Sequence, residues 1–194
     1  MSLVLLIGTV CAILFVFCSA YQMGFRNGRG SDGGEAEPEQ FVLGLFRGDS
    51  TSEEDRRSII SALPGLNWST YNKTYNKVSG QGAMELLTWL YTHPADNAAD
   101  IACILKSTAG LDGAYAEQYT NVVGRMCSSN PQEFVRALST LAEDRVDRIC
   151  SFVGFYSTEN DMAATQDQLG RLADSSGLST RDKALAERLI KAME

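Results

Sequence analysis

The segment from Trp68 to Lys77 combines residue types that could bind a ligand. Trp68, Tyr71 and Tyr75 recur at helical spacing, and Lys73 and Lys77 add a local positive charge to an acidic chain. Aromatic rings beside cations and amides can bind a glycan, a peptide or an acidic protein. These five residues are therefore the candidate binding residues. The same spacing is typical of a helix that buries its aromatic face, and the sequence favours that structural interpretation.

Paired carboxylates are the second group that could do chemistry. Acid–base catalysis requires two acids in one cleft with different pKa values. The acids and arginines that cluster between residues 143 and 148 are typical of a solvated helix face. Glu85 and Glu117 lie among apolar neighbours, so they would matter for catalysis only if the fold buries them. The sequence therefore predicts no catalytic residue.

Metal, thiol and nucleotide chemistry find little support in the sequence. His93 is the single histidine, and because it precedes Pro94 it is expected to cap a helix end. Cys103, Cys127 and Cys150 form no zinc-binding spacing, so we expect buried free thiols, no metal site and no cofactor. The glycines between residues 28 and 33 match a dinucleotide-binding pattern, but no strand precedes them and no helix directly follows.

The composition describes an acidic globular protein. The 194 residues are 44% apolar, with 24 acids against 17 bases and a formal net charge of −7. The apolar content argues against a wholly disordered chain. Because an acidic surface repels phosphate backbones, we expect no nucleic-acid partner.

An apolar run over residues 3–21 predicts a membrane anchor. No charged side chain precedes Arg26. At 1.5 Å per residue, about 19 residues span roughly 28 Å, close to the hydrocarbon thickness of a bilayer. Arg26 and Arg29 follow the run, which favours a single-pass topology with the N-terminus outside and the domain in the cytoplasm. The alternative is a signal peptide that is cleaved near Ala20, followed by export of the domain.

The chain divides into an anchor at 1–23, a flexible Gly-rich and acidic linker at 24–39, and a helical domain at 40–194. Apolar residues in the domain recur at helical spacing, which predicts an all-α fold. Polar residues predict helix starts at six positions, namely Ser50, Asn67, Asp96, Asp112, Asn130 and Ser179.

We expect about nine helices, packed as antiparallel hairpins in a HEAT-like stack or an irregular bundle. The stretch from Glu133 to Tyr156 resembles one HEAT-type helical pair, with two amphipathic helices around a short acidic turn. No fixed-period sequence repeat is evident.

These features predict a membrane-tethered helical module for protein interaction or scaffolding, without catalytic activity. Its partners would be the bilayer, through residues 3–21, and a protein. The alternative is an exported helical enzyme of the cell-wall hydrolase type that uses paired carboxylates. A buried, unpaired acid that faces a second carboxylate would favour the enzyme.

Overall fold

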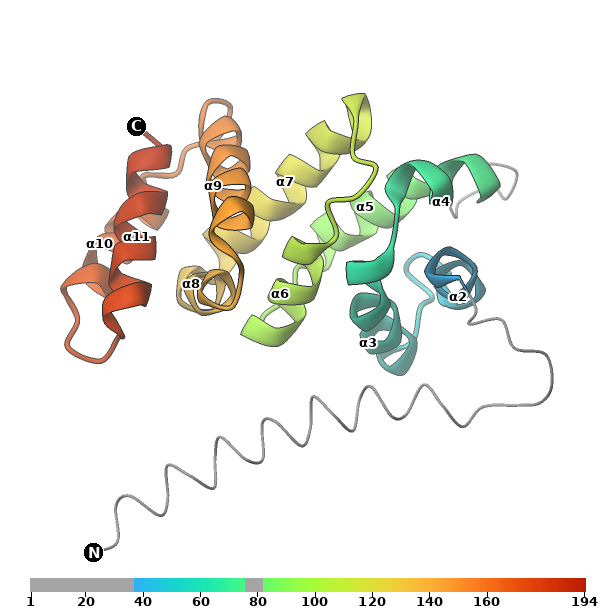
Figure 1. Cartoon of the computed structure of the whole chain (residues 1–194), viewed down its shortest axis with the longest axis horizontal. Helices are drawn as coiled ribbons and strands as arrows, with labels where there is room; N and C mark the ends of the chain where they lie inside the picture. The colour runs from blue at the N-terminus through green and yellow to red at the C-terminus, as the bar shows by residue number, and fades with distance from the viewer. Residues whose placement is uncertain (1–36, 76–81) are drawn as a thin grey trace, which may run out of the picture. The chain divides into compact units, whose positions relative to one another are not determined.

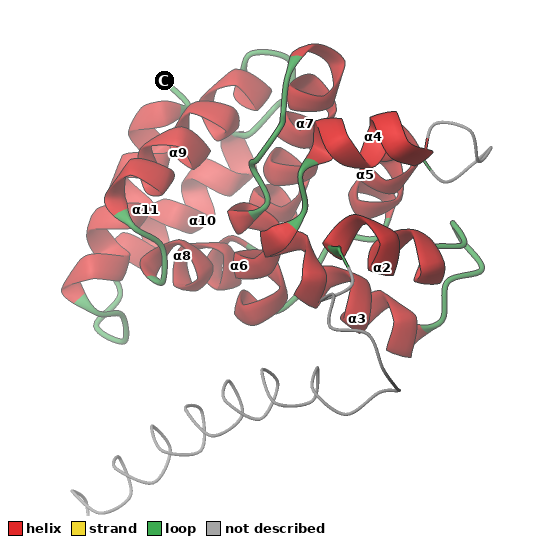
Figure 2. Cartoon of the chain, turned by 45° about the vertical axis from the view of Figure 1, so that its right-hand side comes forward, coloured by secondary structure: helices red, strands yellow, loops and turns green. Residues whose placement is uncertain are grey.

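A computed structural model describes residues 37–75 and 82–194. The described residues are all helical, as predicted, and contain no β-strand (Figures 1 and 2). They form ten α-helices and one short 3-10 turn. The elements are α2 (Pro38–Leu45), α3 (Glu53–Ala62), η1 (Leu63–Gly65), α4 (Trp68–Tyr75), α5 (Ala83–Thr92), α6 (Ala98–Lys106), α7 (Gly113–Ser129), α8 (Pro131–Ser139), α9 (Glu143–Ser157), α10 (Ala163–Asp174) and α11 (Thr180–Ala192).

Side-chain caps start several of these helices. Asn130 accepts a hydrogen bond from the Glu133 backbone N–H, and Ser179 caps α11 as predicted. Two predicted caps were wrong, because the neighbouring polar residue takes the role. Ser52, not Ser50, accepts from Asp55 N, and Asn97, not Asp96, accepts from Asp100 N. In each pair the residue closer to the helix reaches the N–H groups of the first turn.

The domain begins slightly earlier than the predicted boundary. Helix α2 starts at Pro38, and Glu39 is buried with its carboxylate accepting from Asn67 N at 2.9 Å. The end of the predicted linker therefore belongs to the packed helices. The predicted anchor at 3–21, with Arg26 and Arg29, lies outside the described residues. Among the residues that are described, no helix has the length and apolar character needed to cross a bilayer.

Alternate helices pack side by side along the domain (Figure 1). Helix α5 packs on α7, and α7 packs on α9, while α6 packs on α8. Two contacts, Tyr119 with Phe152 and Gly124 with Tyr156, show that α7 and α9 run in the same direction. Helices α10 and α11 pack together at the C-terminal end, where α11 also contacts α8 and α9.

Helices α5, α7 and α9 start at equal intervals along the chain, at Ala83, Gly113 and Glu143. Sequence comparison within the chain did not reveal this regularity. The interval is kept by the positions of the turns, whereas the side chains at matching positions differ. Trp89, Tyr119 and Ile149, for example, each lie six residues after one of these starts.

Candidate functional site

The two aromatic residues at the start of the candidate binding segment lie in the core. Trp68 and Tyr71 are both fully buried. The indole Nε1 of Trp68 donates to the Ser107 carbonyl oxygen at 2.6 Å, and its ring meets Tyr119 edge-on with centroids 6.5 Å apart. The loop between α6 and α7 also holds Trp68 in place, because the Trp68 backbone N–H donates to the Ala109 carbonyl oxygen at 2.9 Å. These two rings therefore offer no surface to a ligand and support the fold.

Trp68 helps to complete the C-terminal end of α6. The last carbonyl groups of a helix have no partner within it. Here the Tyr119 hydroxyl and the Ser107 hydroxyl both donate to Ile104 O at 2.8 Å, and Arg145 Nη1 donates to Lys106 O at 2.6 Å. Burial raises the pKa of Tyr119 above its ordinary range. Helices α4, α7 and α9 thus each contribute a donor near the end of α6, which ties four helices together.

The rest of the candidate segment is only partly described. Lys73 is exposed on α4. Tyr75 is the last residue of α4, and Lys77 lies outside the described residues. Binding by this segment stays a prediction. Of the five candidate residues, Lys73 is the one whose described side chain is exposed to a ligand.

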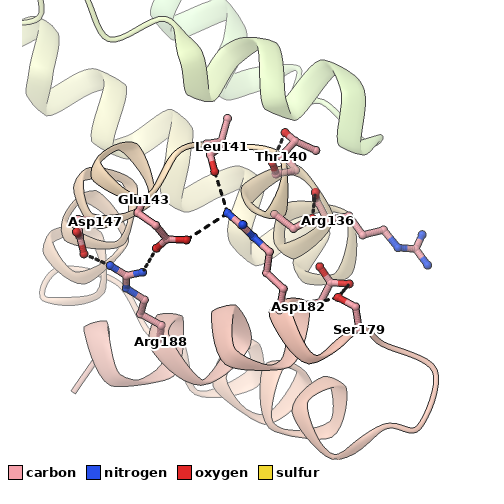
Figure 3. Close-up of polar contacts among 11 residues, drawn as sticks. Arg136, Thr140, Leu141, Glu143, Asp147, Ser179, Asp182 and Arg188 are labelled. Carbon is pink, nitrogen blue, oxygen red and sulfur yellow. Dashed lines mark hydrogen bonds and ion pairs between the residues drawn. The ribbon is translucent and has the colours of Figure 1, made fainter. Parts of the chain in front are cut away.

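The carboxylates around residues 143–147 form a surface network with α11. Glu143 pairs with Arg181 at 3.2 Å and with Arg188 at 3.0 Å, and Arg188 also pairs with Asp147 (Figure 3). Arg181 further donates to the Leu141 carbonyl at 2.9 Å. Each carboxylate side chain is about two-thirds exposed, so the network fits the solvated helix face that the sequence suggested.

No acid in the described part is both buried and unpartnered. Glu85 and Glu117 are exposed, so the fold does not bury them as a catalytic role would require. The buried acid, Glu39, accepts its hydrogen bond from a backbone N–H, which is a structural role. An acid–base pair in a closed cleft would need an acid whose environment favours the neutral form. The described carboxylates do not supply that arrangement.

His93 and the thiols have structural positions. His93 is the C-cap of α5, as expected, with Nδ1 3.1 Å from the Trp89 carbonyl oxygen and its ring tilted against the Trp89 ring. Cys127 and Cys150 are buried free thiols, as expected, whereas Cys103 is only half-buried, so the prediction of burial was wrong for that residue. Burial raises the pKa of the Cys150 thiol to about 11 and that of Cys127 further. Because the thiolate is the nucleophile, both are poor nucleophiles at neutral pH.

Phe155 on α9 is the exception to the burial of large apolar side chains. It is 55% exposed, the one exposed large hydrophobic residue in the described part. Its residue type is typical of a core position. Its position on the helix instead follows Arg148 and Ser151, which also face solvent. The Arg148 guanidinium lies 6.0 Å from the ring centroid of Phe152, one turn before Phe155.

An open pocket of about 330 Å³ lies where the turn at Asn130–Pro131 meets α10. Sequence reasoning missed it, because its walls come from residues far apart in the chain. The other lining residues are Ser129, Gln132, Gln168, Arg171 and Leu172.

No protein-family model, no curated protein and no solved structure matches this chain.

Proposed function

We propose that this chain is a membrane-tethered helical module for protein interaction, without catalysis of its own. The observation that carries the proposal is the exposed ring of Phe155 on the solvent face of α9. The other large aromatic side chains in the described part are buried or half-buried. Aromatic residues, Phe included, are enriched at the centres of protein interfaces, where polar residues form the rim.

The residues around Phe155 indicate what the partner should offer. Ser151 and Arg148 lie on the same face of α9, and Arg148 forms no ion pair with the described acids. The ring of Phe152 holds the Arg148 guanidinium close to the helix surface. The proposed partner is therefore a protein with an apolar pocket for the Phe155 ring and a carboxylate for Arg148.

The tether is the second part of the proposal. Residues 3–21 would span the bilayer once, and Arg26 and Arg29 would keep the domain on the cytoplasmic side. The equal intervals between the starts of α5, α7 and α9, with the side-by-side packing of alternate helices, support a HEAT-like stack as the architecture that presents α9.

Site-specific photo-crosslinking tests the interaction surface in membranes that contain the full chain. A photoreactive phenylalanine at position 155 should give one discrete adduct with another protein. The same group at Glu187, which is exposed on α11, is the control and should not give that adduct. Arg148→Glu should weaken the adduct formed from position 155. Equal labelling from both positions, or an adduct that is indifferent to Arg148→Glu, would contradict the proposed surface.

Membrane extraction tests the tether separately. The full chain should stay in the membrane after high-salt and carbonate washes. Replacement of Ile13 and Leu14 with arginine should release it, because each arginine at the helix centre costs about 2.5–3.5 kcal/mol of insertion free energy. A mature protein that begins at Tyr21 would show cleavage and would contradict the retained anchor.

A further inference from the structure

The pocket beside the Asn130–Pro131 turn is built from three helices. Ser129 ends α7, Gln132 lies in the first turn of α8, and Gln168 and Arg171 lie one turn apart on α10. Asn130 fixes the turn, since its side chain caps α8 and donates to the Asp96 carbonyl at 2.8 Å. Leu172 is half-buried and adds apolar surface. The walls of the pocket are therefore set by helix packing and by a capped turn.

Four polar side chains at this pocket have no partner in the described part of the chain. Ser129, Gln132, Gln168 and Arg171 make no side-chain hydrogen bond or ion pair there, and all four are exposed. This contrasts with Asn130, whose side-chain amide both donates and accepts a hydrogen bond within the fold. The unused groups can supply a guanidinium fork, two amides and a hydroxyl to a bound molecule.

The charge of the lining points to an anion. Arg171 is the one charged residue of the pocket, and no acid lines it. Asp167 and Asp174 share α10 with Arg171, yet neither forms an ion pair with it. The chain as a whole is acidic, with 24 acids and 17 bases, whereas the lining of this pocket carries a positive charge and no negative one.

We propose that this pocket binds a carboxylate. The Arg171 guanidinium would donate two parallel hydrogen bonds to the carboxylate oxygens, while the side-chain N–H groups of Gln132 and Gln168 would donate to the same oxygens or bond an adjacent peptide group. A volume of about 330 Å³ accommodates a small dicarboxylate or the last residues of a peptide. This inference does not depend on Phe155, which lies on a different helix, or on the membrane tether.

Titration of the isotope-labelled full chain in detergent micelles tests the proposal by NMR. Succinate should shift the side-chain amide signals of Gln132 and Gln168 and the Arg171 Nε signal, while neutral succinamide should not. A tripeptide with a free C-terminal carboxylate, compared with its C-terminal amide, separates the two sources of the group. If the acid peptide binds more tightly than succinate, the ligand is a polypeptide end; the reverse order indicates a free small acid.

Two substitutions of the same kind provide the decisive comparison. Arg171→Gln should weaken binding at least about tenfold, as expected for a lost hydrogen bond to a charged group. Arg57→Gln, which also removes an exposed and unpaired arginine, but on α3, should leave binding unchanged. No shift with either carboxylate probe would overturn the proposal. So would shifts that persist in Arg171→Gln or that are lost equally in Arg57→Gln.

Discussion

The ring of Tyr156 on α9 packs directly against the backbone of α7 at Gly124. A Cβ atom at Gly124 would lie under 3.0 Å from three atoms of that ring. The Tyr156 side chain also interacts electrostatically with Tyr91 on α5. Burial, followed by the nearby Tyr91, raises the pKa of Tyr156. The missing side chain at Gly124 thus lets α9 approach α7 closely at this point.

Gly124→Ala should destabilise the domain, although alanine is the better helix former. The added methyl group forces the ring or the helix backbone to move, at a cost of about 1–3 kcal/mol for overpacking. Gly170→Ala on α10 is the matched control, because no atom lies within 4 Å of its added Cβ. It should stabilise the helix by about 0.5–1 kcal/mol. Urea unfolding of both variants measures the difference, and equal effects would contradict the close contact.

Trp68→Ala should lower the free energy of unfolding by about 3–5 kcal/mol, because it empties a fully buried site. Trp68→Phe keeps much of the volume but leaves the buried Ser107 carbonyl without its donor, at a cost of about 1–3 kcal/mol. Chemical denaturation of the two variants separates packing from hydrogen bonding. Wild-type stability in Trp68→Ala would mean that the ring is not part of the core.

Lys73→Glu is expected to leave stability within about 0.5 kcal/mol of wild type, because its side chain is exposed. The same variant tests the surviving part of the predicted binding segment. Unchanged stability together with loss of the crosslinked partner would assign a binding role to this end of α4. Unchanged crosslinking would remove Lys73 from the candidate binding residues.

The buried thiols predict a loss of stability at alkaline pH. An ordinary thiol titrates near 9.0, whereas the pKa of Cys150 in the folded domain is about 11. Because the folded value is raised, the stabilisation is complete below about pH 9 and is lost as pH rises through the folded pKa. The urea midpoint should therefore fall between about pH 9 and 11. The Cys127→Ala, Cys150→Ala variant should show a smaller fall over this range; an identical fall would exclude the thiols as its cause.

Glu143→Gln should have only a small effect, despite the two ion pairs that Glu143 makes with α11. Its side chain is 66% exposed and its partners Arg181 and Arg188 are also partly exposed, so water and salt screen the pairs. We expect a loss of less than about 1 kcal/mol in the free energy of unfolding at low salt, and less at high salt. A salt-independent loss of about 3 kcal/mol or more, as for a broken buried pair, would instead indicate that the pairs are shielded from water.

Local sequence determined the helices, because their signals act over three or four residues. Asn130 and Ser179 each cap a helix by accepting a hydrogen bond from a residue three positions later, so both starts could be predicted. The apolar spacing that predicted an all-α domain has the same short range. Where two polar residues compete, as at Ser50 and Ser52, the sequence could not choose between them.

Only the tertiary structure decided which side chains face solvent. The spacing of Trp68 and Tyr71 is the same for a binding face and for a core face, and the choice rests on Ser107 and Tyr119, far along the chain. Phe155 has the residue type of a core position, yet no described helix covers that side of α9. Helical periodicity fixes which residues share a face, but the packing of other helices fixes which face is buried, and that information lies in contacts between distant residues.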